Sequence, residues 1–284
     1  MTRMESMGES TRDGLGGHDG AMRYREQQRL AKGRCLLTEV TWPVVRDAVE
    51  RGAGIIVPVG ACEQHGYHMP LSTDTILVTE LAVAVADRLG YLVAPPSNYG
   101  FRSRPLSGGG PTYPGTISLS ATALIAQVAD ILDELVRHGF KRIVLLSMHL
   151  ENQNMLWEAA WQTMRGREHE GLRIMVVEQG FASISERAIE ILFGDEFPGW
   201  EVEHAAVMET SLMLFLRPDL VHMDQAVDDA AERKTTYEVL PVPADMITAS
   251  GGLWKATRGT GEKGEAVWAE LVDYLEGAVR MEMA

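Results

Sequence analysis

The chain has 284 residues, of which 26 are basic and 40 acidic, and its formal net charge at pH 7 is −14. A charge of this sign repels phosphate backbones and anionic lipid surfaces, so we expect neither nucleic acid nor a membrane as a partner. Hydrophobic residues make up 45% of the chain, which is enough to bury a large core. No segment reaches the roughly 18 consecutive apolar residues that a membrane-spanning helix needs.

The N-terminal segment differs in composition from the rest. Residues 1–33 are rich in Gly, Ser, Arg and Glu, and such a segment buries too little apolar surface to offset the entropic cost of ordering it. We therefore predict a disordered tail over residues 1–35, with one candidate helix near Ala21–Ala31, followed by a single domain over residues 36–284. The tail lacks the apolar core of a secretory signal, and the chain has only two cysteines, so we expect a cytoplasmic protein.

After Thr41, short β-branched runs alternate with longer helical patterns, which predicts βαβ units and a mostly parallel sheet. The predicted strands are Ile55–Val59, Tyr91–Ala94, Arg142–Ser147 and Leu172–Val177. The predicted helices are Asp74–Leu89, the segment between an N-cap at Ser120 and a stop at Gly139, Asn152–Met164, Ile184–Leu192, His204–Leu216 and Glu262–Val279. The helix that begins at Asp74 is apolar nearly all round, so it should pack deep against the sheet.

Five side chains of the kinds that bind metals follow two of these strands: Glu63, His65, Asp74, His149 and Glu151. The first three come after the strand that ends at Val59, and the other two come after the strand that ends at Ser147. Ligands of open parallel sheets bind beyond the carboxyl ends of the strands, so we expect the two loops to converge. In an extended chain, the i, i+2 spacing of each Glu and His pair directs both side chains to one side.

Two imidazoles and three carboxylates exceed the needs of one tetrahedral zinc ion and suit two divalent ions with one bridging carboxylate. We therefore predict a two-metal site for Zn²⁺ or Mn²⁺. Such a pair can hold a bridging hydroxide and polarise a carbonyl group, as the hydrolysis of an amide requires. For Asp74 alone, an N-terminal helix cap is an equal alternative.

Two further segments carry candidate functional residues. Gly199–His204 places Trp200, Glu201, Glu203 and His204 before a largely apolar helix, so it can supply a flat stacking surface and a proton shuttle. The alternative is a helix N-terminus with favourable acids and a packed tryptophan. The glycine run after Ser107 lets backbone approach a ligand closely, and a structural turn is its equal alternative.

The motifs together resemble those of the creatininase (creatinine amidohydrolase) family. The likeness extends from about Leu37 to the C-terminus, and five motifs occur in order: Pro58–Gly66, Pro70–Asp74, Ser107–Gly110 with Pro114–Thr116, His149–Asn152, and Gly199–Trp200 continuing through Glu209–Leu214. The resemblance implies a three-layer α/β/α sandwich with a mostly parallel central sheet. It also implies a homohexamer arranged as a trimer of dimers.

The resemblance also assigns roles to individual residues. It implies that Glu63 and His149 bind one ion, that His65 and Glu151 bind the other, and that Asp74 bridges them. The residues expected to contact substrate are Ser107, Leu150, Trp200, Glu201 and His204. Glu203 and His204 are expected in proton transfer, and we expect Glu151 to take part in catalysis as well.

Three departures from the creatinine-hydrolysing enzymes bear on the substrate. Leu150 stands where they have Tyr, Glu201 stands where they have Asp, and no tryptophan occurs around Gln179–Phe181, where the family has a lid. Our leading hypothesis is hydrolysis of a small cyclic amide by a metal-bridging hydroxide, with creatinine to creatine as the best candidate. The alternatives are a formamide, for which Arg102 and Arg104 offer basic groups, a peptide, or a metal-stabilised oligomeric binding protein without turnover.

Overall fold

The computed structural model describes residues 18–177, 184–233 and 235–284. Its sheet has four parallel strands in the order β2-β1-β3-β4, namely β1 (Ile55–Val59), β2 (Leu92–Val93), β3 (Arg142–Ser147) and β4 (Arg173–Val177). Ile55 of β1 lies opposite Leu92 on one side and Ile143 on the other. All four predicted strands are present. Strand β2 is shorter than predicted because Pro95 and Pro96 follow it closely and lack the backbone N–H donors that would continue the strand.

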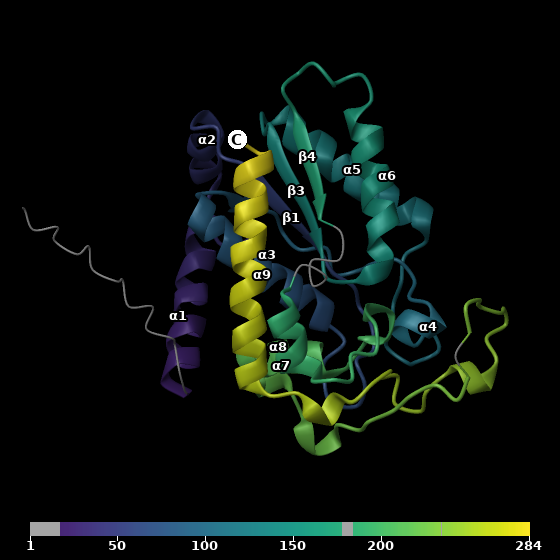
Figure 1. Cartoon of the computed structure of the whole chain (residues 1–284). Helices are drawn as coiled ribbons and strands as arrows, with labels where there is room; N and C mark the ends of the chain where they lie inside the picture. The colour runs from purple at the N-terminus through teal and green to yellow at the C-terminus, as the bar shows by residue number, and fades with distance from the viewer. Residues whose placement is uncertain (1–17, 178–183, 234) are drawn as a thin grey trace, which may run out of the picture.

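Helices cover both faces of the sheet (Figure 1), so the predicted three-layer α/β/α sandwich is confirmed. One layer contains α1 (His18–Cys35), α3 (Thr73–Leu89), α7 (Glu186–Phe193), α8 (Val207–Leu216) and α9 (Gly261–Glu282). The other contains α2 (Trp42–Glu50), α5 (Ala121–Arg137) and α6 (Gln153–Met164). The sheet separates two apolar clusters, because side chains alternate along a strand: Ile56 packs in one cluster, and Ile55 and Val57 pack in the other.

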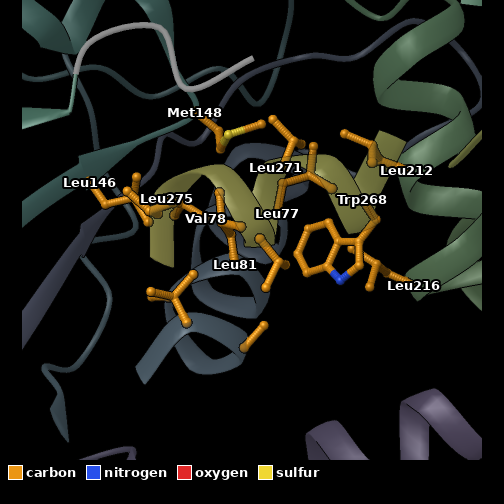
Figure 2. Close-up of a cluster of buried hydrophobic side chains, with 14 of the residues drawn as sticks. Leu77, Val78, Leu81, Leu146, Met148, Leu212, Leu216, Trp268, Leu271 and Leu275 are labelled. Carbon is orange, nitrogen blue, oxygen red and sulfur yellow. The ribbon is translucent and has the colours of Figure 1, made fainter. Parts of the chain in front are cut away.

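The larger apolar cluster lies where α3 and α9 pack together (Figure 2). Leu77 and Leu81 of α3 lie among Trp268, Leu271 and Leu275 of α9, and each is at most 2% exposed. The prediction that α3 is deeply buried is therefore confirmed. Its burial fixes the start of α3, where Asp74 lies.

Helix α1 corrects the prediction of a disordered tail over residues 1–35, and it contains the candidate helix near Ala21–Ala31. The helix occupies His18–Cys35, and only residues 1–17 of the predicted tail lie outside the described part of the chain. The ring of Tyr24 lies 5.2 Å from that of Phe215, and the amide of Gln28 donates to the backbone oxygen of Glu80 at 2.9 Å. Tyr24, Gln28, Ala31 and Cys35 recur at helical spacing on one face, a stripe that the polar composition conceals.

The helix boundaries determine what surrounds the site. Ser120 caps α5 as predicted, because its Oγ accepts from Ala123 N at 3.2 Å. Helix α8 begins three residues later than predicted, since Ala205 has φ +50° and Ala206 is extended. The remaining helical elements are short: α4 (Pro105–Gly108), η1 (Leu150–Asn152), η3 (Trp200–Val202), η4 (Pro218–Leu220), η5 (Met223–Gln225), η6 (Ala244–Met246) and η7 (Ala256–Arg258). Among the described residues, no helix combines the length and apolarity that crossing a membrane requires.

Candidate metal centre and active site

Asn152 connects the loops that form the site. Its side chain is fully buried, its Nδ2 donates to Gly60 O at 3.0 Å and to Ser147 Oγ at 3.1 Å, and its Oδ1 accepts from Phe101 N at 2.7 Å. The ends of β1 and β3 and the loop after β2 are thereby joined. Gly60 lets the first of these loops approach α3, since a Cβ there would lie 2.6 Å from Thr75 Cα. The predicted convergence of the two loops is confirmed.

A first group of potential metal ligands consists of Glu63, Asp74 and His149, all buried. His149 Nδ1 lies 3.0 Å from Glu63 Oε2 and 3.3 Å from Asp74 Oδ2. The other ring nitrogen, Nε2, lies 2.9 Å from Phe101 O and donates to that carbonyl. With the ring N–H used in this way, Nδ1 presents a lone pair to two carboxylates, an arrangement that requires a positive charge among them.

A second group consists of His65, Asp74 and Glu209. His65 Nε2 lies 3.3 Å from Asp74 Oδ1 and 3.7 Å from Glu209 Oε2. Its Nδ1 lies 3.1 Å from Glu63 O and donates to that backbone oxygen, so this histidine also directs a lone pair at carboxylates. Asp74 belongs to both groups and offers a different oxygen to each. The sequence analysis assigned no role to Glu209.

The buried polar atoms of these groups fit a cation. Both carboxylate oxygens of Glu63, Nε2 of His65 and Oδ2 of Asp74 have no hydrogen-bond partner among the described residues. Each of the three residues is at most 2% exposed. An unsatisfied buried polar atom costs roughly 1–3 kcal/mol, and more if it is charged. Divalent ions would satisfy all of these atoms, and the donor set of imidazoles and carboxylates suits Zn²⁺ and Mn²⁺.

The pKa shifts of these residues in the metal-free chain also indicate that the cluster favours a cation. Burial raises the pKa of Glu63 and Asp74, but neighbouring histidines lower both by more than burial raises them. Burial lowers the pKa of His65, yet Asp74 and Glu209 bring it to about 10. The pKa of His149 is likewise raised, mainly by Glu63 against the effect of burial. The cluster therefore holds positive charge strongly, in the form of protons when metal is absent.

Glu151 lies beside these groups, and its carboxylate is oriented by other partners. Its Oε1 accepts from Ser107 Oγ and, at 3.2 Å, from Arg104 N. Its Oε2 lies 3.6 Å from His149 Nε2. The i, i+2 argument assumed extended backbone, whereas Leu150–Asn152 form the 3₁₀ turn η1. Glu151 consequently does not lie on the same side as His149 Nδ1.

His204 belongs to a third group of potential metal ligands, together with Glu63 and His65, and it is held by Gln64. His204 Nε2 is 2.9 Å from both the backbone oxygen and the side-chain nitrogen of Gln64, and the same side-chain nitrogen donates to Gly108 O and Gly251 O at 3.2 and 3.0 Å. The ring of His204 lies 4.6 Å from that of His65. Gln64 is 5% exposed, and the sequence analysis did not single it out.

Glu203 is the second predicted proton-transfer residue. Its side chain is buried, Oε1 accepts from Met208 N near the start of α8, and Oε2 has no hydrogen-bond partner among the described residues. Burial, together with the nearby carboxylate of Glu209, raises the pKa of Glu203 well above its usual range. The protonated form of this carboxyl group is therefore favoured.

Two cavities adjoin at Ser107. The inner cavity, of about 20 Å³, is lined by Glu63, Asp74, Ser107, Met148, His149, Leu150, Glu151, Trp200, Glu203, His204 and Glu209. The outer cavity, of about 380 Å³, is lined by Arg104–Ser107, Glu201, Val202, Ala231, Thr235–Glu238 and Leu253. Trp200 and Leu150 thus lie at the inner cavity, whereas Glu201 lies at the outer one. The predicted lid region around Gln179–Phe181 lies outside the described residues.

Comparison with known proteins agrees with this geometry. The family model for creatininase, described as creatinine amidohydrolase, matches residues 38–279. A creatinine amidohydrolase of Pseudomonas putida is 38% identical over 248 residues, which cover 86% of this chain and 95% of the relative. A mycofactocin precursor peptide peptidase of Mycobacterium ulcerans is 30% identical over 246 residues, covering 82% of this chain and 83% of the relative.

Solved creatininase structures match closely as well. A manganese form superposes with a TM-score of 0.83 at 37% identity, covering 87% of this chain and 98% of that one. Two variant creatininases, one of Zn-Zn type and one complexed with creatine, match with the same TM-score and identity. The chain therefore belongs to the creatininase family and is a metal-dependent amidohydrolase.

Proposed function

We propose that the chain binds two divalent ions, Zn²⁺ or Mn²⁺ or one of each. In this proposal Glu63 and His149 hold the first ion, His65 and Glu209 hold the second, and Asp74 bridges them. Asp74 belongs to the group with Glu63 and His149 and to the group with His65 and Glu209, and it offers a different oxygen to each, which supports the bridge. Glu209 takes the place that the family resemblance gave to Glu151, because its carboxylate and not that of Glu151 is grouped with His65. The manganese and Zn-Zn forms of related structures support the choice of ions.

One observation carries this proposal. Each of the two ligand histidines donates one ring N–H to a backbone carbonyl, His65 to Glu63 O and His149 to Phe101 O, and turns its other nitrogen toward buried carboxylates. A second hydrogen bond of this kind fixes the tautomer of metal-binding histidines. Without metal ions, these nitrogens would have to carry protons in order to face the carboxylates, and divalent ions would take the place of those protons.

When bound, such ions would activate a water molecule and polarise the carbonyl of the substrate. The chain itself would move the protons. His204 Nε2 lies 3.9 Å from Glu63 Oε1, on the side of the ligand groups, and would deliver a proton to the leaving nitrogen as the amide C–N bond breaks and water adds across it. Glu203, whose protonated form is favoured by burial and by the nearby carboxylate of Glu209, would supply a proton. Glu151, held by Ser107 and Arg104 N, would orient the reacting groups at the cavity mouth.

We propose a small cyclic amide as substrate, with creatinine to creatine as the best candidate, which Trp200 would contact from the wall of the inner cavity. The 38% identity to a creatinine amidohydrolase and the related complex with creatine support this choice. Leu150 stands where creatinine-hydrolysing enzymes have Tyr and removes one hydroxyl group from the inner cavity. We further propose a cytoplasmic homohexamer arranged as a trimer of dimers.

A peptide is the second candidate substrate. A relative that is 30% identical over most of both chains is a peptidase, and the outer cavity of about 380 Å³ is open to a larger molecule.

The test is hydrolysis by protein loaded with Zn²⁺ or Mn²⁺ and supplied with creatinine, other small lactams, a formamide and short peptides. We expect turnover of creatinine or a related lactam, loss of that turnover in His204→Ala, and no change in the exposed control His138→Ala. Turnover of peptides alone would replace the proposed substrate class. Metal binding and ligand binding without turnover of any compound would identify a binding protein instead.

A further inference from the structure

The inner cavity is too small to hold a substrate body. Its volume of about 20 Å³ is little more than the roughly 10–15 Å³ that one water molecule needs. The outer cavity, at about 380 Å³, falls within the range of roughly 300–1,000 Å³ that is usual for small-molecule sites. Because Ser107 lines both cavities, a molecule whose amide reaches the inner cavity can extend past Ser107 into the outer one.

The walls of the outer cavity have a mixed character. Pro105 and Leu106 of α4, Val202 of η3 and Leu253 contribute apolar surface, and Tyr237 contributes an aromatic ring. Part of the lining comes from the long connection between α8 and α9, which extends beside α4 (Figure 1). An aliphatic chain can therefore be covered on several sides.

The charges of the outer cavity are unequal. Its charged lining residues in the described part of the chain are Arg104, Glu201 and Glu238. The Arg104 guanidinium lies 3.9 Å from the Glu238 carboxylate and so partly neutralises it. No basic side chain in the described part of the chain forms an ion pair with Glu201. Among the described residues, the lining therefore carries one net negative charge, and it lies in a chain whose net charge is −14.

We propose that the outer cavity is a subsite for a second part of the substrate, an aliphatic arm that ends in a cation such as an alkylammonium or alkylguanidinium group. The arm packs on Leu106 and Tyr237, and the cation lies between Glu201 and Glu238. This inference rests on the proposed function, because the amide at the other end of the arm is the group that is hydrolysed. Among cyclic amides with the same reacting group as creatinine, those that carry this arm are accordingly preferred.

The test uses four rings with the same reacting amide, namely creatinine and its analogues with a butyl, an ω-aminobutyl or an ω-carboxybutyl group on the ring methylene carbon. We expect kcat/KM to be highest for the aminobutyl ring, about fivefold above the butyl ring, since a partly exposed ion pair is worth up to about one kcal/mol. In the Glu201→Gln, Glu238→Gln double variant, this ratio should fall to about one. Tyr237→Ala should reduce the advantage of the butyl ring over unsubstituted creatinine.

The matched control is Glu232→Gln, an exposed acid of the same connection that does not line the outer cavity; it should leave the aminobutyl-to-butyl ratio unchanged. Calorimetric binding of the same four rings to the metal-loaded protein gives a second readout, in which the order of affinities should be the same. Equal rates and affinities for all four rings, or a preference for the carboxybutyl ring, would overturn the subsite. If no ring were hydrolysed, the proposed function would fail, and the binding order would still decide the subsite.

Discussion

The substitution Glu209→Gln tests the role of Glu209 because it removes the charge of the side chain and keeps its size. The structure and the sequence analysis differ most in this role. The side chain is 7% exposed. Its Oε2 accepts from Ala205 N at 2.7 Å and lies 3.7 Å from His65 Nε2. A glutamine has nearly the same volume and keeps an oxygen to accept from Ala205 N, so the fold should be retained. The substitution removes a negative charge from the second ligand group.

The expected effect on metal binding is large. A pair of unit charges about 4 Å apart interacts by about 4 kcal/mol at an effective dielectric constant near 20. A neutral amide recovers part of this, because it is cheaper to bury than a carboxylate. We therefore expect the affinity for one of the two ions to fall at least about 100-fold, or about 2.7 kcal/mol. The ion held by Glu63 and His149 should be affected much less.

The assay is zinc titration by calorimetry, together with metal analysis after dialysis against a weak chelator. Wild-type protein should retain two ions per chain and Glu209→Gln one. Glu151→Gln is the matched control, because Glu151 carries the same charge beside the same cavity but is held by Ser107 and Arg104 N; it should retain both ions and lose activity. If Glu151→Gln lost an ion while Glu209→Gln kept both, the ligand set proposed here would be refuted.

Three further predictions concern the groups around the metal site and the N-terminal helix. Although burial lowers the pKa of His65, neighbouring carboxylates bring it to about 10, above its ordinary 6.5. Their attraction for the protonated ring stabilises the metal-free fold fully below pH 6.5, and this stabilisation is lost as pH rises through about 10. The free energy of unfolding of metal-free protein in urea should therefore decline from neutral pH to pH 10, and a rise would contradict this. Gln64→Met removes the side-chain hydrogen bonds around His204. The value of kcat should therefore fall roughly 5- to 100-fold, with little change in KM and with a shifted pH profile of the rate. An unchanged pH profile would show that Gln64 has no positioning role. Tyr24→Ala removes a ring that packs on Trp268, so the free energy of unfolding should fall by about 3 kcal/mol in urea titrations, and an effect below about 0.5 kcal/mol would show that α1 is dispensable.

Most of the site could be predicted because its residues follow strands. Glu63 and His149 come directly after β1 and β3, and parallel neighbours end at one edge of a sheet, so their convergence required only the order of residues and the strand pattern. The roles of Glu151 and Glu209 could not be predicted in this way. The 3₁₀ turn at Leu150–Asn152 depends on tertiary contacts, and Glu209 reaches the site from α8, which no local spacing connects to His65.

A physical signal for Glu209 was nevertheless present in the sequence. It is the only charged residue between Ala205 and Leu216 in an otherwise largely apolar helix, and acids are almost never fully buried unless they are paired or bind a metal. The length of helix α1 beyond the candidate Ala21–Ala31, and its packing against the domain, were missed for a different reason. Its buried stripe includes Tyr24 and Gln28, which a count of apolar residues weighs poorly, and its packing depends on α3 and α8 far along the chain.

The most direct test of the central claim is anomalous diffraction at the zinc edge from crystals of the zinc-loaded protein. The account predicts two peaks in each chain, one contacted by Glu63 and His149 and the other by His65 and Glu209, with an oxygen of Asp74 on each. A single peak, no peak, or two peaks that Asp74 does not share would contradict it.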